Sequence, residues 1–149
     1  MVNQSLHLRP IEILLVEDNP GDVDLTIIAL QESKVNNNLH IAGDGVEALE
    51  FLRHDPGYED VPRPDIILLD LNLPRKHGRQ VLQEIKEDPD LRRIPVVVLT
   101  TSEEEEDVVG SYSQYVNCYI NKPVDLEQLI TIVKSIESFW FTIVTLPQQ

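Results

Sequence analysis

The sequence predicts an α/β protein in which five parallel strands form one sheet between two layers of helices. Short, nearly continuous apolar runs alternate five times with segments whose apolar residues recur at helical spacing. Such runs are typical of parallel strands that helices cover on both faces. Right-handed crossovers leave few topologies, and we expect the flavodoxin-like, three-layer (βα)5 arrangement with strand order 2-1-3-4-5. The first and third strands would then be neighbours.

The expected strands are the apolar runs, each of which is bounded by turn-forming residues. They cover residues 11–16, 39–42, 65–70, 95–99 and 118–121. The third run is the most apolar and should be the central strand, because a central strand is buried on both faces. Before it, residues 54–64 contain Pro56, Gly57, Pro62 and Pro64, which predicts a long connection.

Helices are expected between these strands. The first helix should begin within residues 19–22, and the next two should follow the turn 43–45 and the loop 73–78. The fourth should cover residues 103–113, and the last should begin at residue 126. Pro20 and Asp22 suit the start of the first helix, which should end near Ser33; the third should end near Asp88, and Asp125 can cap the last. Apolar residues at helical spacing should face the core: Val23, Ile27 and Leu30, then Val46, Leu49 and Leu52, then Val81, Leu82 and Ile85.

The composition is that of a small, acidic protein with a real core. The chain has 149 residues, 42% of them apolar, and a formal charge of −14. Such a surface repels phosphate backbones and anionic membranes, so we expect no nucleic-acid or membrane partner. No run of ~18 apolar residues is present, and no basic segment followed by an apolar stretch opens the sequence. With a single cysteine, Cys118, these features predict a cytoplasmic protein without an internal disulfide.

Acidic, hydroxyl and amine side chains stand where the predicted strands end. Glu17 and Asp18 follow the first strand, Asp70 ends the third, Thr100 follows the fourth and Lys122 follows the fifth. Because the carboxyl ends of parallel strands meet at one edge of the sheet, these residues should lie together. Two carboxylates ~4 Å apart repel by about 4 kcal/mol at an effective dielectric near 20, so a divalent cation should neutralise the group.

The expected site suits phosphoryl transfer that depends on a metal ion. Few protein oxygens and open water positions favour Mg²⁺, and Mn²⁺ would also fit. A carboxylate can act as the nucleophile toward phosphorus, and Asp70 is the candidate. The cation and Lys122 would neutralise charge on the phosphoryl oxygens, while Thr100 would donate a hydrogen bond to them.

Four motifs carry a resemblance to a known family. They are ILLVED at residues 13–18, IILLD at 66–70, VVVLT at 96–100 and YINKP at 119–123. In their order and spacing they resemble the response-regulator receiver domain of two-component signalling, over about residues 11–139. The resemblance implies a phosphoacceptor signalling domain and not a conventional enzyme, with Mg²⁺-dependent self-phosphorylation and autodephosphorylation. The phosphoryl group would come from the phosphohistidine of a sensor histidine kinase.

The resemblance also implies a role for each site residue. Mg²⁺ would be bound by Glu17, Asp18, Asp70 and the backbone carbonyl of Asn72. Asp70 would accept the phosphoryl group, and Lys122 and Thr100 would contact its oxygens. Thr100 and Tyr119 would form the switch that responds to phosphorylation. The Lys122-Pro123 bond would be cis. Segments 54–64 and 71–79 and the aromatic tail are similar to the small stand-alone regulators of cyanobacterial phytochrome histidine kinases, which makes such a kinase the expected partner.

Other interpretations of the same residues stay open. An unphosphorylated pseudo-receiver, acting as a protein-binding scaffold, would share the fold, although such domains usually lack an acid or the lysine. A phosphatase of the haloacid dehalogenase type would need a second acid two residues after the nucleophile, where this chain has Asn72. Taken singly, Glu17 and Asp18 could cap the following helix, and Lys122 could be an ordinary solvated lysine.

The apolar C-terminal segment predicts a further contact. We expect residues 1–10 to be a lead-in, 11–139 the receiver domain and 140–149 an extension. Residues 139–146 include Phe139, Trp140 and Phe141, and each aromatic side chain can bury about 150–250 Å². We expect the last helix and this segment to form a homodimer contact, with folding back onto the same domain as the alternative. No second core follows, so the chain should act through a partner surface.

Overall fold

The computed structural model describes residues 10–33, 36–100, 118–121, 127–128 and 131. Its sheet has five parallel strands in the order β2-β1-β3-β4-β5, which confirms the predicted topology. The strands are β1 (Ile11–Val16), β2 (Asn37–Ala42), β3 (Ile66–Asp70), β4 (Val96–Thr100) and β5 (Cys118–Asn121). The helices are α2 (Pro20–Ser33), α3 (Gly45–Arg53) and α4 (Gly78–Glu87), with a short 3₁₀ helix η1 (Leu91–Arg93).

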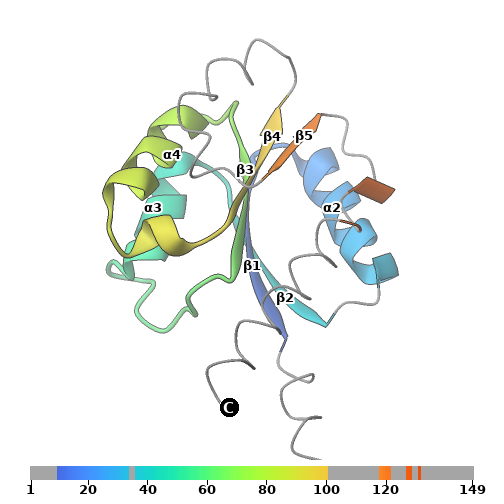
Figure 1. Cartoon of the computed structure of the whole chain (residues 1–149), viewed down its shortest axis with the longest axis horizontal. Coiled ribbons are helices and arrows are strands. Elements are labelled where there is room, and N and C mark those ends of the chain that lie inside the picture. The colour runs from blue at the N-terminus through green and yellow to red at the C-terminus, as the bar shows by residue number, and fades with distance from the viewer. Residues whose placement is uncertain (1–9, 34–35, 101–117, 122–126, 129–130, 132–149) are drawn as a thin grey trace, which may run out of the picture.

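The helices form a layer on each side of the sheet. Figure 1 shows α2 on one face and α3 with α4 on the other. All of β3 is buried, as expected for the central strand. Successive residues of a strand point to opposite faces, so β1 and β3 each supply both cores. Leu14 and Leu69 face α3 and α4, whereas Ile13 and Leu68 face α2.

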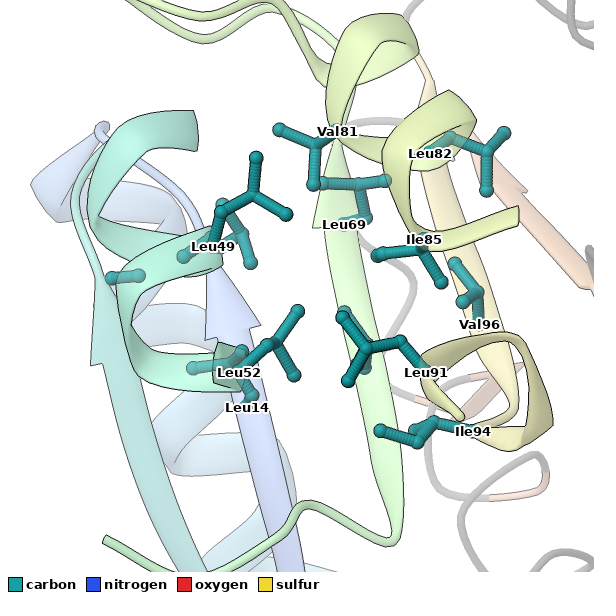
Figure 2. Close-up of a cluster of buried hydrophobic side chains, with 14 of the residues drawn as sticks. Leu14, Leu49, Leu52, Leu69, Val81, Leu82, Ile85, Leu91, Ile94 and Val96 are labelled. Carbon is teal, nitrogen blue, oxygen red and sulfur yellow. The ribbon is translucent and has the colours of Figure 1, made fainter. Parts of the chain in front are cut away.

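The larger core lies beneath α3 and α4. Figure 2 shows Leu49 and Leu52 of α3, and Val81, Leu82 and Ile85 of α4, pointing toward the sheet. The predicted inward residues of these two helices are buried, apart from the half-buried Val46. Burial of apolar surface stabilises this packing by ~25 cal/mol per Å² and thereby fixes α3 and α4 against the sheet.

The inward face of α2 differs from the predicted one. Leu30 is buried as expected, but Val23 and Ile27 are only half-buried, and Thr26 and Ala29 occupy the centre of the contact. The helix is apolar nearly all round, so periodicity alone could not choose its inner face. The Thr26 hydroxyl is tolerated there because it donates to the Asp22 carbonyl at 3.0 Å.

Strand β2 begins at Asn37, two residues before the predicted start. Asparagine disfavours strands, which is why residues 37–38 resemble a loop in the sequence. In the structure they pair with the first residues of β1, and the Asn38 amide donates to Glu12 Oε2 at 2.9 Å. The bounds of β3 and β4 differ from prediction by one residue.

Several predictions concern segments outside the described residues. These are the acidic helix at 103–113, the cap at Asp125 and most of the last helix, the cis bond before Pro123, and most of the lead-in and all of the extension. In the part of the chain that the structure describes, no helix is both long enough and apolar enough to cross a membrane.

Candidate metal centre

Three carboxylates meet at the carboxyl edge of the sheet. Glu17 directly follows β1, and Asp70 is the last residue of β3. Because Val16 pairs with Leu69 in parallel register, the next residues along, Glu17 and Asp70, lie side by side. With Asp18 they bring one oxygen each to within 4.8 Å of one another. The sequence predicted this juxtaposition.

Two of these carboxylates are enclosed by protein. Glu17 is 2% exposed and Asp70 is 1% exposed, whereas Asp18 is exposed to solvent. The two buried carboxylates, whose oxygens lie within 4.8 Å of each other, repel by roughly 3 kcal/mol or more at an effective dielectric near 20, whereas solvent screens much of the repulsion from the exposed Asp18. A divalent cation would offset that repulsion, and an all-oxygen ligand set suits a hard cation such as Mg²⁺ or Mn²⁺. The residues present therefore fit a divalent metal ion, with Asp18 on the open side.

Backbone groups of the following loops hold the carboxylates in place. The N–H of Asn19 donates to Glu17 Oε2 at 3.3 Å, and the Asn19 side chain accepts from Asp22 N at the start of α2. The N–H of Asn72 donates to Asp70 Oδ1 at 3.0 Å. Hydrogen bonds from backbone N–H groups to a carboxylate are charge-assisted, and they limit the rotation of the side chain. Asn72, predicted as a carbonyl ligand, thus also contacts Asp70 through its N–H.

The loop of residues 71–77 carries Asn72 and connects β3 to α4. At its end, His77 caps α4: its Nδ1 atom accepts from Arg79 N at 3.1 Å, and its backbone N–H donates to the Gln80 side chain. Gly78 begins the helix, and its N–H donates to the Leu71 carbonyl at 3.0 Å. A Cβ atom at Gly78 would lie 2.4 Å from the Asp70 carbonyl oxygen. The helix N-terminus is thus pressed against the backbone of the candidate nucleophile.

Two acidic side chains bind this loop: Asp44, the N-cap residue of α3, and Glu84 of α4. Burial acts to raise the pKa of Asp44, but a hydrogen bond from Glu47 N and the Arg75 guanidinium outweigh it, and the pKa is lowered. Burial also acts to raise the pKa of Glu84, but hydrogen bonds from Lys76 and Arg53 and their positive charges outweigh it, and the pKa is lowered. Both carboxylates are therefore ionised at neutral pH. The sequence carries no signal for these pairs, because their partners come from separate loops and helices.

The other predicted residues are described only in part. Thr100 ends β4, the neighbour of β3, and Tyr119 lies within β5, paired with Val98. Thr100 therefore lies on the strand next to that of Asp70, and Tyr119 lies one strand further away. Their side chains, and the whole of Lys122, lie outside the described residues.

Comparison with known proteins identifies the family. Residues 13–134 match the family described as the response regulator receiver domain. The chain belongs to this family. A receiver is a signalling domain of two-component systems and not a conventional enzyme, in agreement with the sequence-based expectation.

Similar receivers include regulators associated with phytochromes. The response regulator Rcp1 of Synechocystis sp. is 54% identical over 138 residues, covering 93% of this chain and 94% of Rcp1. The phosphorylated cyanobacterial phytochrome response regulator RcpA matches with a TM-score of 0.75 and 52% identity, over 91% of this chain and 96% of RcpA. The Mn²⁺-bound form of Rcp1 matches with a TM-score of 0.74 and 53% identity, over 89% and 95%. The expected resemblance to phytochrome response regulators is confirmed.

Proposed function

We propose that this receiver accepts a phosphoryl group on Asp70, with a divalent cation, Mg²⁺ by preference, held by Glu17, Asp18 and Asp70. The observation that carries the proposal is the convergence of these three carboxylates within 4.8 Å at the end of β1 and β3. The backbone carbonyl of Asn72 would complete the protein ligands. A pseudo-receiver scaffold would have no need of three mutually repelling acids, two of them buried, and is disfavoured on that ground.

The transfer proposed is a displacement at phosphorus. A carboxylate oxygen of Asp70 attacks the phosphohistidine of the kinase; the new P–O bond forms as the P–N bond breaks, and the imidazole nitrogen retains the electron pair. The Asn72 N–H bonded to Asp70 Oδ1 holds the carboxylate during the attack. A bound Mg²⁺ would supply positive charge against the phosphoryl oxygens. Lys122 and Thr100 would contact those oxygens, and Thr100 and Tyr119 would convert phosphorylation into a change of surface.

The partner proposed is a sensor histidine kinase of the phytochrome type, in the cytoplasm. The proposal is supported by the similarity to the phytochrome response regulator RcpA over most of both chains. Incubation with ³²P-labelled phytochrome kinase, and separately with labelled acetyl phosphate, tests it with and without Mg²⁺. Labelling from either donor that requires Mg²⁺ supports the phosphoacceptor. No labelling of the folded protein from either donor would leave the scaffold interpretation.

We expect Asp18→Ala to weaken Mg²⁺ binding at least about tenfold, because one of three charged ligands is lost. In the absence of metal, the same change should raise the free energy of unfolding by up to about 1 kcal/mol, since it removes repulsion from the buried pair Glu17 and Asp70. Metal titration followed by amide chemical shifts, and urea unfolding without metal, measure the two effects. Asp24→Ala, at an exposed acid of α2, is the matched control. Unchanged Mg²⁺ affinity in Asp18→Ala would remove Asp18 from the site.

We also propose the domain division given by the sequence, with a homodimer contact through the last helix and residues 139–146. The proposal is supported by the aromatic residues of this segment, since three of them could contribute at most roughly 11–19 kcal/mol if fully buried. We expect a chain truncated after Ser138 to be monomeric in light scattering, whereas the full chain is a dimer. A dimer mass retained after truncation would contradict the contact, and a monomeric full chain would favour folding back.

A further inference from the structure

Arg75, in the loop that carries Asn72, adopts an unusual backbone conformation. Among the described residues, Arg75 and His54 are the two non-glycine residues with positive φ, and φ of Arg75 is 61°. The N–H of Lys76 donates to the Pro74 carbonyl at 2.7 Å, which closes a three-residue turn around Arg75. Such a turn with positive φ at its centre is rare and strained. Strain of this kind persists only where the surroundings impose it, often beside functional sites.

The Arg75 side chain supplies part of that restraint. Its Nε and Nη2 atoms lie 2.8 and 2.7 Å from Asp44 Oδ2. The other carboxylate oxygen of Asp44 accepts from Glu47 N at 2.8 Å and so caps α3. Asp44 therefore ties the strained turn to the first residues of a packed helix. Charge-assisted hydrogen bonds of this length are among the stronger polar contacts in proteins.

The next residue is held from two sides. The Lys76 ammonium pairs with Glu84 of α4, whose second oxygen accepts from Arg53 of α3 at 3.1 Å. A Cβ atom at Gly45 would lie only 2.3 Å from the Lys76 carbonyl oxygen, so the start of α3 touches the loop backbone directly. Residues 75 and 76 are thus fixed between two helices that are themselves anchored in the larger core.

The restrained residues 75 and 76 are connected to Asp70, the proposed nucleophile, by a short stretch of the same loop. Asn72 lies three residues before Arg75, and its N–H donates to Asp70 Oδ1 at 3.0 Å. The other end of the loop returns to the sheet where Gly78 N donates to the Leu71 carbonyl. A displacement of the turn at Arg75 must therefore be taken up by the short segment that presents Asn72.

We propose that Arg75 is a positioning residue: its ion pair with Asp44 holds the loop so that Asn72 and Asp70 are in place to bind a divalent cation. The inference rests on the proposed function, because it concerns the metal affinity of that site. Arg75 is itself 59% exposed, so its pair contributes little to the stability of the whole domain. The effect of removing it should be confined to the loop and to metal binding.

The test is a double-mutant cycle on Mg²⁺ affinity. Arg75→Gly removes the pair while accepting positive φ, and Asp44→Asn keeps an N-cap residue for α3 while removing the charge. Each should weaken Mg²⁺ binding about three- to tenfold, less than the loss of a ligand or of a residue that contacts one, because Arg75 acts on the site only through the loop. The double variant should be little worse than either single one, because both break the same pair. Arg75→Lys, which keeps the charge, should recover part of the affinity.

Arg63→Gly is the matched control, because Arg63 makes a comparable exposed pair with Asp90 before the opposite end of β3. Mg²⁺ titration followed by the amide shifts of Asn72 and Gly78, with urea unfolding in the absence of metal, separates affinity from stability. The proposal is supported if affinity falls in both pair variants, with unfolding free energies close to that of the control. It is overturned if Arg75→Gly or Asp44→Asn binds Mg²⁺ within twofold of wild type, or if the control weakens binding equally. A wild type that binds no Mg²⁺ would instead overturn the proposed function, and this inference with it.

Discussion

We expect Asp70→Asn to reduce phosphoryl uptake to below about 0.1% of wild type, because it removes the nucleophile on which the chemistry depends. An amide oxygen is a far weaker nucleophile than a carboxylate and carries no charge to attract a cation. The substitution nearly preserves the size of a side chain that is 1% exposed. It also preserves an oxygen that can accept the Asn72 N–H now bonded to Asp70 Oδ1. The fold should therefore survive the loss of function.

The measurement is ³²P transfer from acetyl phosphate in the presence of Mg²⁺, with circular dichroism and urea unfolding to establish that the variant is folded. Asp24→Asn makes the same change at an exposed acid of α2 and should label like wild type. Because Asp70→Asn removes one of three clustered negative charges, the metal-free variant should be at least as stable as wild type. Wild-type labelling of Asp70→Asn would mean that another residue is the acceptor.

The part of the site that could be predicted from sequence is the part fixed by where the strands end. The apolar runs that end at Val16 and Leu69 each stop at an acidic residue, and parallel pairing aligns them one to one. Once the strand order is known, Glu17 and Asp70 must be neighbours, whatever the side chains around them. This part of the prediction depends on backbone geometry alone, which is why it is confirmed by the arrangement of the carboxylates.

Features that depend on polar side chains were not predicted. Arg75 and Asp44 are 31 residues apart in the chain and lie in different loops, and a sequence pattern carries no signal for such a pair. The positive φ of Arg75 was also missed, because arginine has no preference for that region. The prediction of the inner face of α2 was wrong because the sequence offers too many apolar candidates. Leu25, Ile28 and Leu30 are all apolar, so hydrophobicity could not distinguish the buried side of the helix from the exposed one.

The close approach at Gly78 leads to the largest stability effect that we expect. A Cβ atom there would lie 2.4 Å from the Asp70 carbonyl oxygen and 2.5 Å from Leu71 Cα, and both are backbone atoms that cannot rotate away. The helix cannot simply retreat, because Gly78 N donates to the Leu71 carbonyl and Val81 is packed in the core. We expect Gly78→Ala to lower the free energy of unfolding by about 3 kcal/mol or more.

Gly43→Ala is the matched control for this substitution. A Cβ atom at Gly43 would meet its nearest neighbour, Glu47 Oε2, at 3.8 Å, which is ordinary contact. Its free energy of unfolding, measured in urea, should lie within about 0.5 kcal/mol of wild type, so its urea midpoint should be close to that of wild type. A Gly78→Ala midpoint equal to that of Gly43→Ala would show that the helix can shift away from β3. If the clash persists, it pushes on the carbonyl of Asp70 itself, so any folded Gly78→Ala should also bind Mg²⁺ more weakly than the control. Loss of stability and loss of metal affinity together would locate the strain at the end of β3, where the proposed chemistry takes place.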